Sequence, residues 1–236
     1  MMRLDKFLAD MDVGTRTEVK KLIRKGTVVV NGEIIKQPEY KVSQTDEIVC
    51  QGEAICYQKY VYYMLHKPAG VVSATEDNID TTVIELLKGV PTKGLFPVGR
   101  LDKDTEGLLL ITNDGQLSHD LLSPKKHIDK TYYAKIVGEV TEIDVEAFVQ
   151  GLEIGEKQPT LPATLEILTS GHISEVKITI QEGKFHQIKR MFQAVDKEVL
   201  YLKRLQMGTL VLDETLPVGA FRKLSEKELQ DLCYRE

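Results

Sequence analysis

The segment 99–110, GRLDKDTEGLLL, carries three carboxylates within five residues, Asp102, Asp104 and Glu106. Carboxylates at this density can hold a divalent cation or act at a glycosidic bond, or they can simply form an acidic turn. A calcium loop needs oxygen donors over a twelve-residue spacing that ends in Glu, whereas this segment runs at once into apolar residues 108–111. Glycosidic chemistry requires a separation of carboxylates that one local cluster does not establish, so both that interpretation and a structural acidic turn stay open.

The elements around this segment predict an α+β fold. Strands and helices alternate without a regular βαβ rhythm, which favours a largely antiparallel mixed sheet with flanking helices over a doubly wound nucleotide-binding fold. Ser225 and Glu228 have the spacing of a capping box and predict the start of a last helix. The strands are predicted over 60–65, 107–112, 130–137, 163–168, 174–180 and 208–212, and the helices over 82–88, 115–122, 144–150 and 187–195.

The first 55 residues predict a separate small module of the order helix, helix, hairpin. A helix is expected over 3–10, and a second over 15–26, where Thr15 and Glu18 form a capping box and Gly26 suits a left-handed helix end. Asn31-Gly32 predicts a two-residue type I′ turn between two short strands. After a further strand at 47–50, we place the domain boundary at residues 51–58, and we predict domains over 1–55 and 59–236.

Charge in this module is unevenly distributed. Residues 1–53 hold nine Lys or Arg and nine Asp or Glu, but residues 15–26 hold five cations and one anion. Steps of three and four residues place several of these cations opposite the apolar stripe of the second helix. A solvated helix face explains such a stripe without any ligand.

The composition excludes several classes of protein. The chain has 236 residues, 42% hydrophobic and 28% charged, with a net charge of −5, as expected for a water-soluble globular protein and not for a disordered or membrane-spanning one. The acidic balance by itself argues against nucleic acid. Three cysteines without a CxxC pair predict neither a disulfide framework nor a zinc site, so we expect a cytoplasmic protein.

Two stretches resemble known RNA-related families. The arrangement RLDKFLADMDVGTRTEVKKLIRKGTVVVNGEII resembles the S4 RNA-binding domain over residues 2 to about 50. The segment GRLDKDTEGLLLITNDG resembles the signature of the pseudouridine synthases, closest to the RsuA family that acts on ribosomal RNA. The second resemblance extends through Lys67-Pro68-Ala69-Gly70, Phe96-Pro97-Val98, Lys130-Thr131-Tyr132 and QEGKFHQIKRM at 181–191.

The resemblance implies that Asp102 is the nucleophile of an isomerase that breaks the N-glycosidic bond of a uridine and rejoins the uracil through a carbon. An ionised carboxylate either traps the sugar carbon or adds to the base, and the resemblance does not decide between these routes. Burial raises the pKa of a carboxyl and a nearby cation lowers it, so a basic partner is needed. Lys189 stands where the family has such a residue, whereas Arg190 is expected to point elsewhere.

Two further residues are implied to contact the target nucleotide. Tyr132 matches a tyrosine whose ring can stack on the uracil and whose phenol can join proton transfer. Tyr133 must face the other side of its strand. Arg100 matches an arginine that, in related synthases, helps to take the nucleotide out of its stack. Asp104 and Thr105 are expected to orient the loop, and His186 to be a supporting or RNA-proximal residue.

The resemblance also implies the partners. Arg3, Arg16, Lys20, Lys21 and Arg24 are implied to contact the RNA backbone. Residues 184–204, with six cations and two anions, predict a second basic patch. The stretch HQIKRMF at 186–192 resembles the small-subunit enzyme, so we expect a uridine of 16S rRNA, with 23S rRNA or a non-catalytic role in ribosome assembly as alternatives. We expect a monomer with no metal, cofactor or membrane attachment.

Overall fold

The structure is a computed structural model and describes all residues except 12, 56–58 and 234–236. The predicted boundary at 51–58 falls partly on 56–58, outside the described residues. The chain divides into two compact units, Met1–Tyr60 with Gly89–Lys93, and Val61–Lys88 with Gly94–Glu236. Each unit has its own buried core. Among the described residues, no helix has the length and apolar character of a membrane span.

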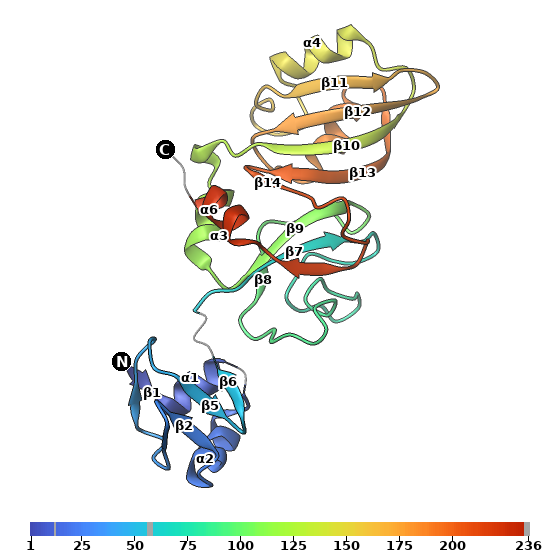
Figure 1. Cartoon of the computed structure of the whole chain (residues 1–236). Coiled ribbons are helices and arrows are strands. Elements are labelled where there is room, and N and C mark those ends of the chain that lie inside the picture. The colour runs from blue at the N-terminus through green and yellow to red at the C-terminus, as the bar shows by residue number, and fades with distance from the viewer. Residues whose placement is uncertain (12, 56–58, 234–236) are drawn as a thin grey trace. The chain divides into compact units, whose positions relative to one another are not determined.

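The first unit has the predicted order of helix, helix and hairpin (Figure 1). Thr15 and Glu18 form the predicted capping box at the start of α2, and Gly26 adopts a φ of +74° just beyond its end. Asn31 and Gly32 have φ of 51° and 85°, as the predicted turn requires. The elements are β1 (Met2–Arg3), α1 (Leu4–Asp10), α2 (Arg16–Arg24), β2 (Val28–Val30), β3 (Glu33–Ile34), β4 (Lys41–Val42), β5 (Ile48–Cys50) and β6 (Glu53–Ile55).

The second unit is built on a mixed sheet in the order β11-β12-β10-β13-β9-β7-β15, with β14 beside β13 and β8 beside β9. Neighbours pair antiparallel except β9 and β13, which are parallel, so the predicted α+β class with a largely antiparallel sheet is confirmed. Its strands are β7 (Tyr62–Lys67), β8 (Phe96–Pro97), β9 (Glu106–Thr112), β10 (Lys130–Val137), β11 (Thr164–Thr169), β12 (Ile173–Ile180), β13 (Glu198–Met207), β14 (Leu210–Val211) and β15 (Phe221–Lys223).

Helices pack against this sheet and form two hydrophobic cores with it. Phe148 of α4 and Phe192 of α5 pack together over β10–β13, with ring centroids 4.9 Å apart. Leu121 of α3 and Leu232 of α6 share a second core with the apolar residues of β9. The capping box of Ser225 and Glu228 is present before α6. The helical elements are α3 (Gly115–Leu122), the short 3₁₀ helix η1 (Pro124–Lys126), α4 (Glu142–Gln150), α5 (Gln187–Gln193) and α6 (Glu226–Cys233).

One prediction about secondary structure is wrong, and one long strand was not predicted. Residues 82–88 form no helix: Thr82 and Glu85 exchange hydrogen bonds like a capping box, but a single turn follows before Gly89 and Pro91. Strand β13 lies where no element was predicted. Its polarity does not alternate, because Arg204 is 2% exposed on the buried face while Leu200 is 54% exposed.

Candidate active site

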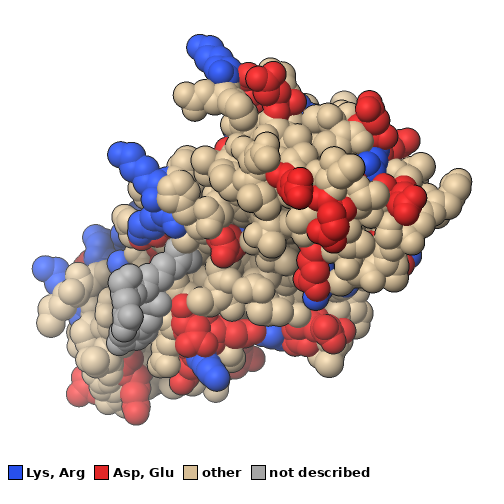
Figure 2. Space-filling view, turned by 90° about the horizontal axis from the view of Figure 1, so that it is seen from above, with Lys and Arg blue, Asp and Glu red and all other residues tan. Residues whose placement is uncertain are grey.

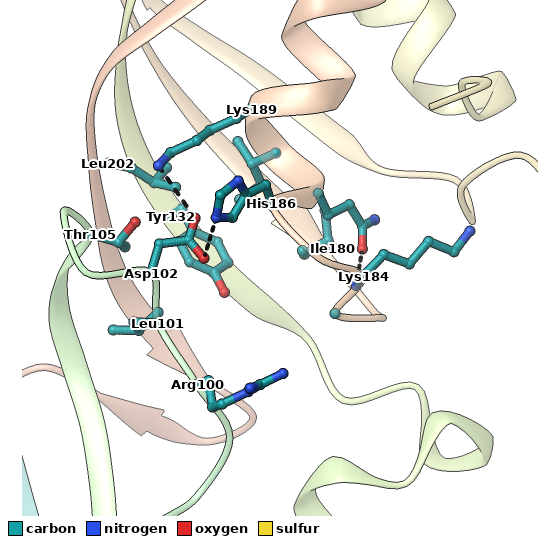
Figure 3. A pocket seen from close by; sticks show the side chains of 13 residues that line it. Arg100, Leu101, Asp102, Thr105, Tyr132, Ile180, Lys184, His186, Lys189 and Leu202 are labelled. Carbon is teal, nitrogen blue, oxygen red and sulfur yellow. Dashed lines mark hydrogen bonds and ion pairs between the residues drawn. The ribbon is translucent and has the colours of Figure 1, made fainter. Parts of the chain in front are cut away.

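A pocket in the second unit is lined by the residues that were predicted to be catalytic or to bind the nucleotide (Figure 3). Its walls come from the loop before β9, from β10 and β13, and from the segment that leads into α5. Asp102, Tyr132, Lys189 and Arg100, which are far apart in the sequence, all line it. The lining residues are Arg100, Leu101, Asp102, Thr105, Tyr132, Ile180, Gly183, Lys184, His186, Gln187, Ile188, Lys189 and Leu202.

Asp102 lies in a tight turn, in which the Thr105 amide donates to the Asp102 carbonyl at 3.0 Å. Its side chain is 26% exposed, and the carboxylate faces two basic side chains (Figure 3). Lys189 Nζ lies 3.4 Å from Oδ2, and His186 Nε2 lies 3.7 Å from Oδ1. The structure thus places His186, which was expected to be a supporting or RNA-proximal residue, nearly as close to the carboxylate as Lys189.

Lys189 is shared between two carboxylates. It donates to both oxygens of Asp104, at 2.7 and 2.8 Å, while it faces Asp102. Burial acts to raise the pKa of Asp104, but the hydrogen bonds and charge of Lys189 outweigh it, so this pKa lies below its usual value. Asp104 is 71% exposed. Asp104 was expected to orient the loop, and the structure shows that it also binds Lys189, while Asp102 faces the pocket.

Lys67, at the end of β7, is a residue that sequence reasoning missed. Its side chain is fully buried and its ammonium donates to the carbonyls of Pro68, Asp102, Lys103 and Thr105, at 2.8 to 3.3 Å. Burial lowers its pKa to about 8, against the attraction of the nearby carboxylates. One buried amine therefore binds three backbone carbonyls of the turn that carries Asp102. Lys67 begins the stretch Lys67-Pro68-Ala69-Gly70 that carries the family resemblance, but the resemblance gave the lysine itself no role.

We expect Lys67→Met to lower the activity about tenfold or more, because three carbonyls of the Asp102 turn lose their donor. Hydrogen exchange should show the cause. The amides of Gly70 and Thr105, which bond to the Lys103 and Asp102 carbonyls, should lose protection, while the Val98 amide, bonded to Leu110, should keep it. Unchanged exchange at Gly70 and Thr105 would show that Lys67 does not order this turn.

The floor of the pocket is held by close packing. Tyr132 is 7% exposed and packs in the core with Leu101, Ile188 and Leu202 while it lines the pocket. Tyr133 faces the other side of β10, as predicted, and its ring meets that of Tyr201 with centroids 6.1 Å apart. The pocket therefore has one fixed aromatic wall, suited to a flat base.

Two groups in the pocket have spare hydrogen-bonding capacity. Arg100 is exposed and, among the described residues, makes no ion pair or hydrogen bond. The Thr105 hydroxyl is buried and also has no described partner. A free guanidinium suits a phosphate, and a buried hydroxyl suits a polar edge of a base.

Gly107 fixes the strand that follows the turn. Its φ is +106°, and a Cβ atom there would lie 2.2 Å from the carbonyl oxygen of Arg204 on the parallel strand β13. No side chain fits in that space, so β9 and β13 approach each other closely only with glycine at this position. This approach brings the turn of Asp102 next to β13.

The first unit presents several of the predicted cations on α2. Arg16, Lys21 and Arg24 are exposed and Lys20 is half-buried. Arg3 instead binds the buried Asp5 through two hydrogen bonds of 3.0 Å, and this lowers the pKa of Asp5. Lys20 approaches the same carboxylate at 4.0 Å.

The predicted basic patch at 184–204 is not a free cationic surface. Arg204 is buried, and the other partnered cations are held by carboxylates: Lys184 by Glu182, Lys189 by Asp102 and Asp104, Arg190 by Glu156, and Lys197 by Asp144. On the face that Figure 2 shows, acidic and basic side chains both occur, with uncharged surface between them. Counting charges along the sequence overstates this patch, because their partners lie in other segments.

No three His, Cys, Asp or Glu side chains are arranged to hold a metal ion within the described part of the chain. The side chains that line the pocket include a carboxylate, a lysine, an imidazole, a phenol and a guanidinium. This set can perform nucleophilic and acid–base chemistry on a flat, polar substrate that carries a phosphate.

Comparisons with known proteins agree with this chemistry. Residues 61–194 match the family model described as RNA pseudouridylate synthase, and residues 2–48 match the S4 domain. The chain is 46% identical to the RNA pseudouridine synthase YtzG of Bacillus subtilis, with 97% of each chain covered. It is 43% identical to ribosomal small subunit pseudouridine synthase A of Vibrio cholerae, with 98% of this chain and 99% of the relative covered. A crystal structure of a pseudouridylate synthase matches 98% of this chain and 100% of its own length, with 41% identity and a TM-score of 0.70.

Proposed function

The chain belongs to the RNA pseudouridylate synthase family, and from this premise we propose that it converts a uridine of 16S ribosomal RNA to pseudouridine. The observation that carries the proposal is the pocket itself. In it, the carboxylate of Asp102 faces Lys189 and His186 beside the ring of Tyr132. The small-subunit target is supported by the relative from Vibrio cholerae and its nearly complete coverage.

The reaction is redox-neutral and uses side chains alone. The bond between the sugar C1′ and uracil N1 breaks, the uracil turns, and a bond forms between C1′ and C5 while the C5 proton leaves and N1 is protonated. Asp102 acts as the nucleophile, either on C1′ or on the base. Lys189 compensates its negative charge, and the Tyr132 ring stacks on the uracil.

Arg100 and Thr105 complete the binding of the nucleotide in this proposal. A target uridine must leave its stack to reach Asp102, which costs a few kcal/mol. The guanidinium of Arg100, which has no partner among the described residues, binds the phosphate of the extruded nucleotide. The buried Thr105 hydroxyl accepts or donates a hydrogen bond at the edge of the uracil.

Purified protein and transcripts of 16S and 23S ribosomal RNA test the proposal directly. We expect pseudouridine at one position of the 16S transcript and none in the 23S transcript. Modification of the 23S transcript alone would assign the large-subunit target instead. Protein that binds either RNA and modifies neither would favour a non-catalytic assembly role.

Residues 1–55 act as an S4 RNA-binding domain in this proposal, and residues 59–236 as the catalytic domain. The S4 domain uses Arg16, Lys20, Lys21 and Arg24 on the RNA backbone, where phosphate contacts position the protein and carry no sequence information. Arg3, which was also expected there, is paired with Asp5. The protein works as a monomer and, with ribosomal RNA as its substrate, in the cytoplasm.

Replacing Lys20, Lys21 and Arg24 together by Ala should weaken RNA binding and flatten its salt dependence. Loss of three phosphate contacts lowers the slope of log Kd against log salt concentration by about 2 to 3. The slope is measured by titrating the 16S transcript at several salt concentrations.

A matched control removes three cations from the second unit, Lys135, Lys177 and Lys227. This variant has the same net charge as the first, so the salt slopes of the two separate local contacts from overall charge. Equal slopes in wild type and in the variant of α2 would remove α2 from the RNA interface.

A further inference from the structure

Phe185 exposes its ring at the edge of the pocket. The side chain is 71% exposed, more than that of any other aromatic residue in the described part of the chain. It does not line the pocket, but it stacks on His186, which does, with ring centroids 3.8 Å apart and planes inclined by 18°. Single exposed apolar side chains are common on protein surfaces, so the exposure alone assigns no ligand. The position of this ring, stacked on a residue that lines the pocket, makes it a candidate contact for the substrate.

The backbone around this ring is held firmly. The Phe185 carbonyl accepts a hydrogen bond from Arg190 at 3.1 Å, and Arg190 is itself paired with Glu156 at 2.8 Å. The Lys184 amide donates to the Gln187 side chain at 2.9 Å. The fold therefore fixes the backbone that presents the exposed ring.

The conformation of His186 connects the ring to the reacting carboxylate. His186 has φ 48° and ψ 35°, a left-handed conformation that is uncommon outside glycine and is found at functional sites. With this backbone, the imidazole lies 3.7 Å from Asp102 on one side and against the Phe185 ring on the other. A continuous series of contacts thus runs from Asp102 through His186 to an open aromatic face.

We propose that Phe185 stacks on the base next to the target uridine and holds the RNA strand at the mouth of the pocket. The inference rests on the proposed function, because the extruded uridine occupies the pocket beside Asp102 and Tyr132. The neighbouring nucleotide then lies outside, where Phe185 stands. Aromatic side chains bind single-stranded bases by stacking with little sequence preference, because every base has a flat face.

The sequence provides a direct probe, because the chain contains no Trp. Phe185→Trp introduces a single indole at the proposed contact, and its fluorescence should be quenched saturably by the 16S transcript as a base stacks on it. Ile143→Trp is the control, on an α4 residue that is 77% exposed and does not line the pocket. Its fluorescence should change little with the same RNA.

Kinetics give the second readout. Phe185→Leu keeps an apolar side chain but removes the flat ring. The rate of pseudouridine formation at subsaturating enzyme should therefore fall about tenfold, while the rate at saturating enzyme stays within about twofold. Phe185→Trp should remain close to wild type in both. Unquenched indole fluorescence in an active complex of Phe185→Trp with RNA, or wild-type kinetics in Phe185→Leu, would overturn the inference. Wild-type protein that forms no pseudouridine would instead refute the proposed function.

Discussion

Asp102→Asn should abolish pseudouridine formation, with a loss of at least about a thousandfold, and leave RNA binding nearly unchanged. The amide has the shape of the carboxylate but is a very poor nucleophile, so the step that breaks the glycosidic bond loses its attacking group. A thousandfold loss corresponds to about 4 kcal/mol of transition-state stabilisation. Pseudouridine is quantified in the 16S transcript at saturating enzyme, and affinity is measured on the same RNA.

Asp104→Asn provides the matched control, two residues along the same turn. Asp104 is exposed and binds Lys189, so its amide should disturb the lysine but not remove the nucleophile. We expect a loss of no more than about tenfold. Conversion at the wild-type rate by Asp102→Asn would refute the assignment of the nucleophile, and an equal loss in both variants would mean that the turn acts through its charge alone.

Lys189→Met should lower the activity about a hundredfold or more. Methionine has a similar length but no charge, so Asp102 and Asp104 would face each other without a cation between them. Lys189→Arg keeps the charge and should recover most of the loss. Lys177→Met on β12, outside the pocket, controls for the removal of a lysine and should retain wild-type activity.

Lys189→Met should also change how the stability of the fold depends on pH. The pKa of Asp104 in the folded protein lies below its usual value of 3.8, so its ion pair with Lys189 adds stability above that value and loses it as the pH falls through the folded pKa. Urea unfolding should therefore show a difference between wild type and Lys189→Met at about pH 6 that shrinks as the pH approaches about 3. A difference that grows on acidification would contradict the ion pair.

Local signals predicted much of the fold. The capping boxes at Thr15 and Ser225 and the turn at Asn31-Gly32 depend on residues within four positions of one another, so the sequence contains all of the interaction. The apolar run at 108–111 likewise predicts a buried strand whatever its neighbours are. Such features can be predicted because their partners are close along the chain.

Features that depend on distant partners could not be predicted in this way. Strand β13 lies between β9 and β10, and its buried Arg204 donates to the Leu108 carbonyl, a contact across 96 residues. The capping signal at Thr82 is real, but Gly89 and Pro91 limit it to one turn. Local propensity predicts how an element starts more reliably than whether tertiary packing will extend it.

The same distinction holds for the candidate site. Family motifs placed Asp102, Tyr132, Lys189 and Arg100 in one pocket, but they gave no role to Lys67, whose acceptors lie up to 38 residues away. The proximity of His186 to Asp102 depends on its left-handed backbone, which its residue type does not specify. The net charge of −5 argued against binding of nucleic acid, but it is an average over the whole chain. It does not show that exposed cations are concentrated on α2.

The most direct test maps pseudouridine in ribosomal RNA from cells that contain the wild-type protein, contain only Asp102→Asn, or lack the protein. The account predicts one uridine of 16S ribosomal RNA that is modified with the wild-type protein and remains uridine in both other strains. An unchanged map of 16S and 23S ribosomal RNA in the strain without the protein would contradict it, as would full modification in the strain that contains only Asp102→Asn.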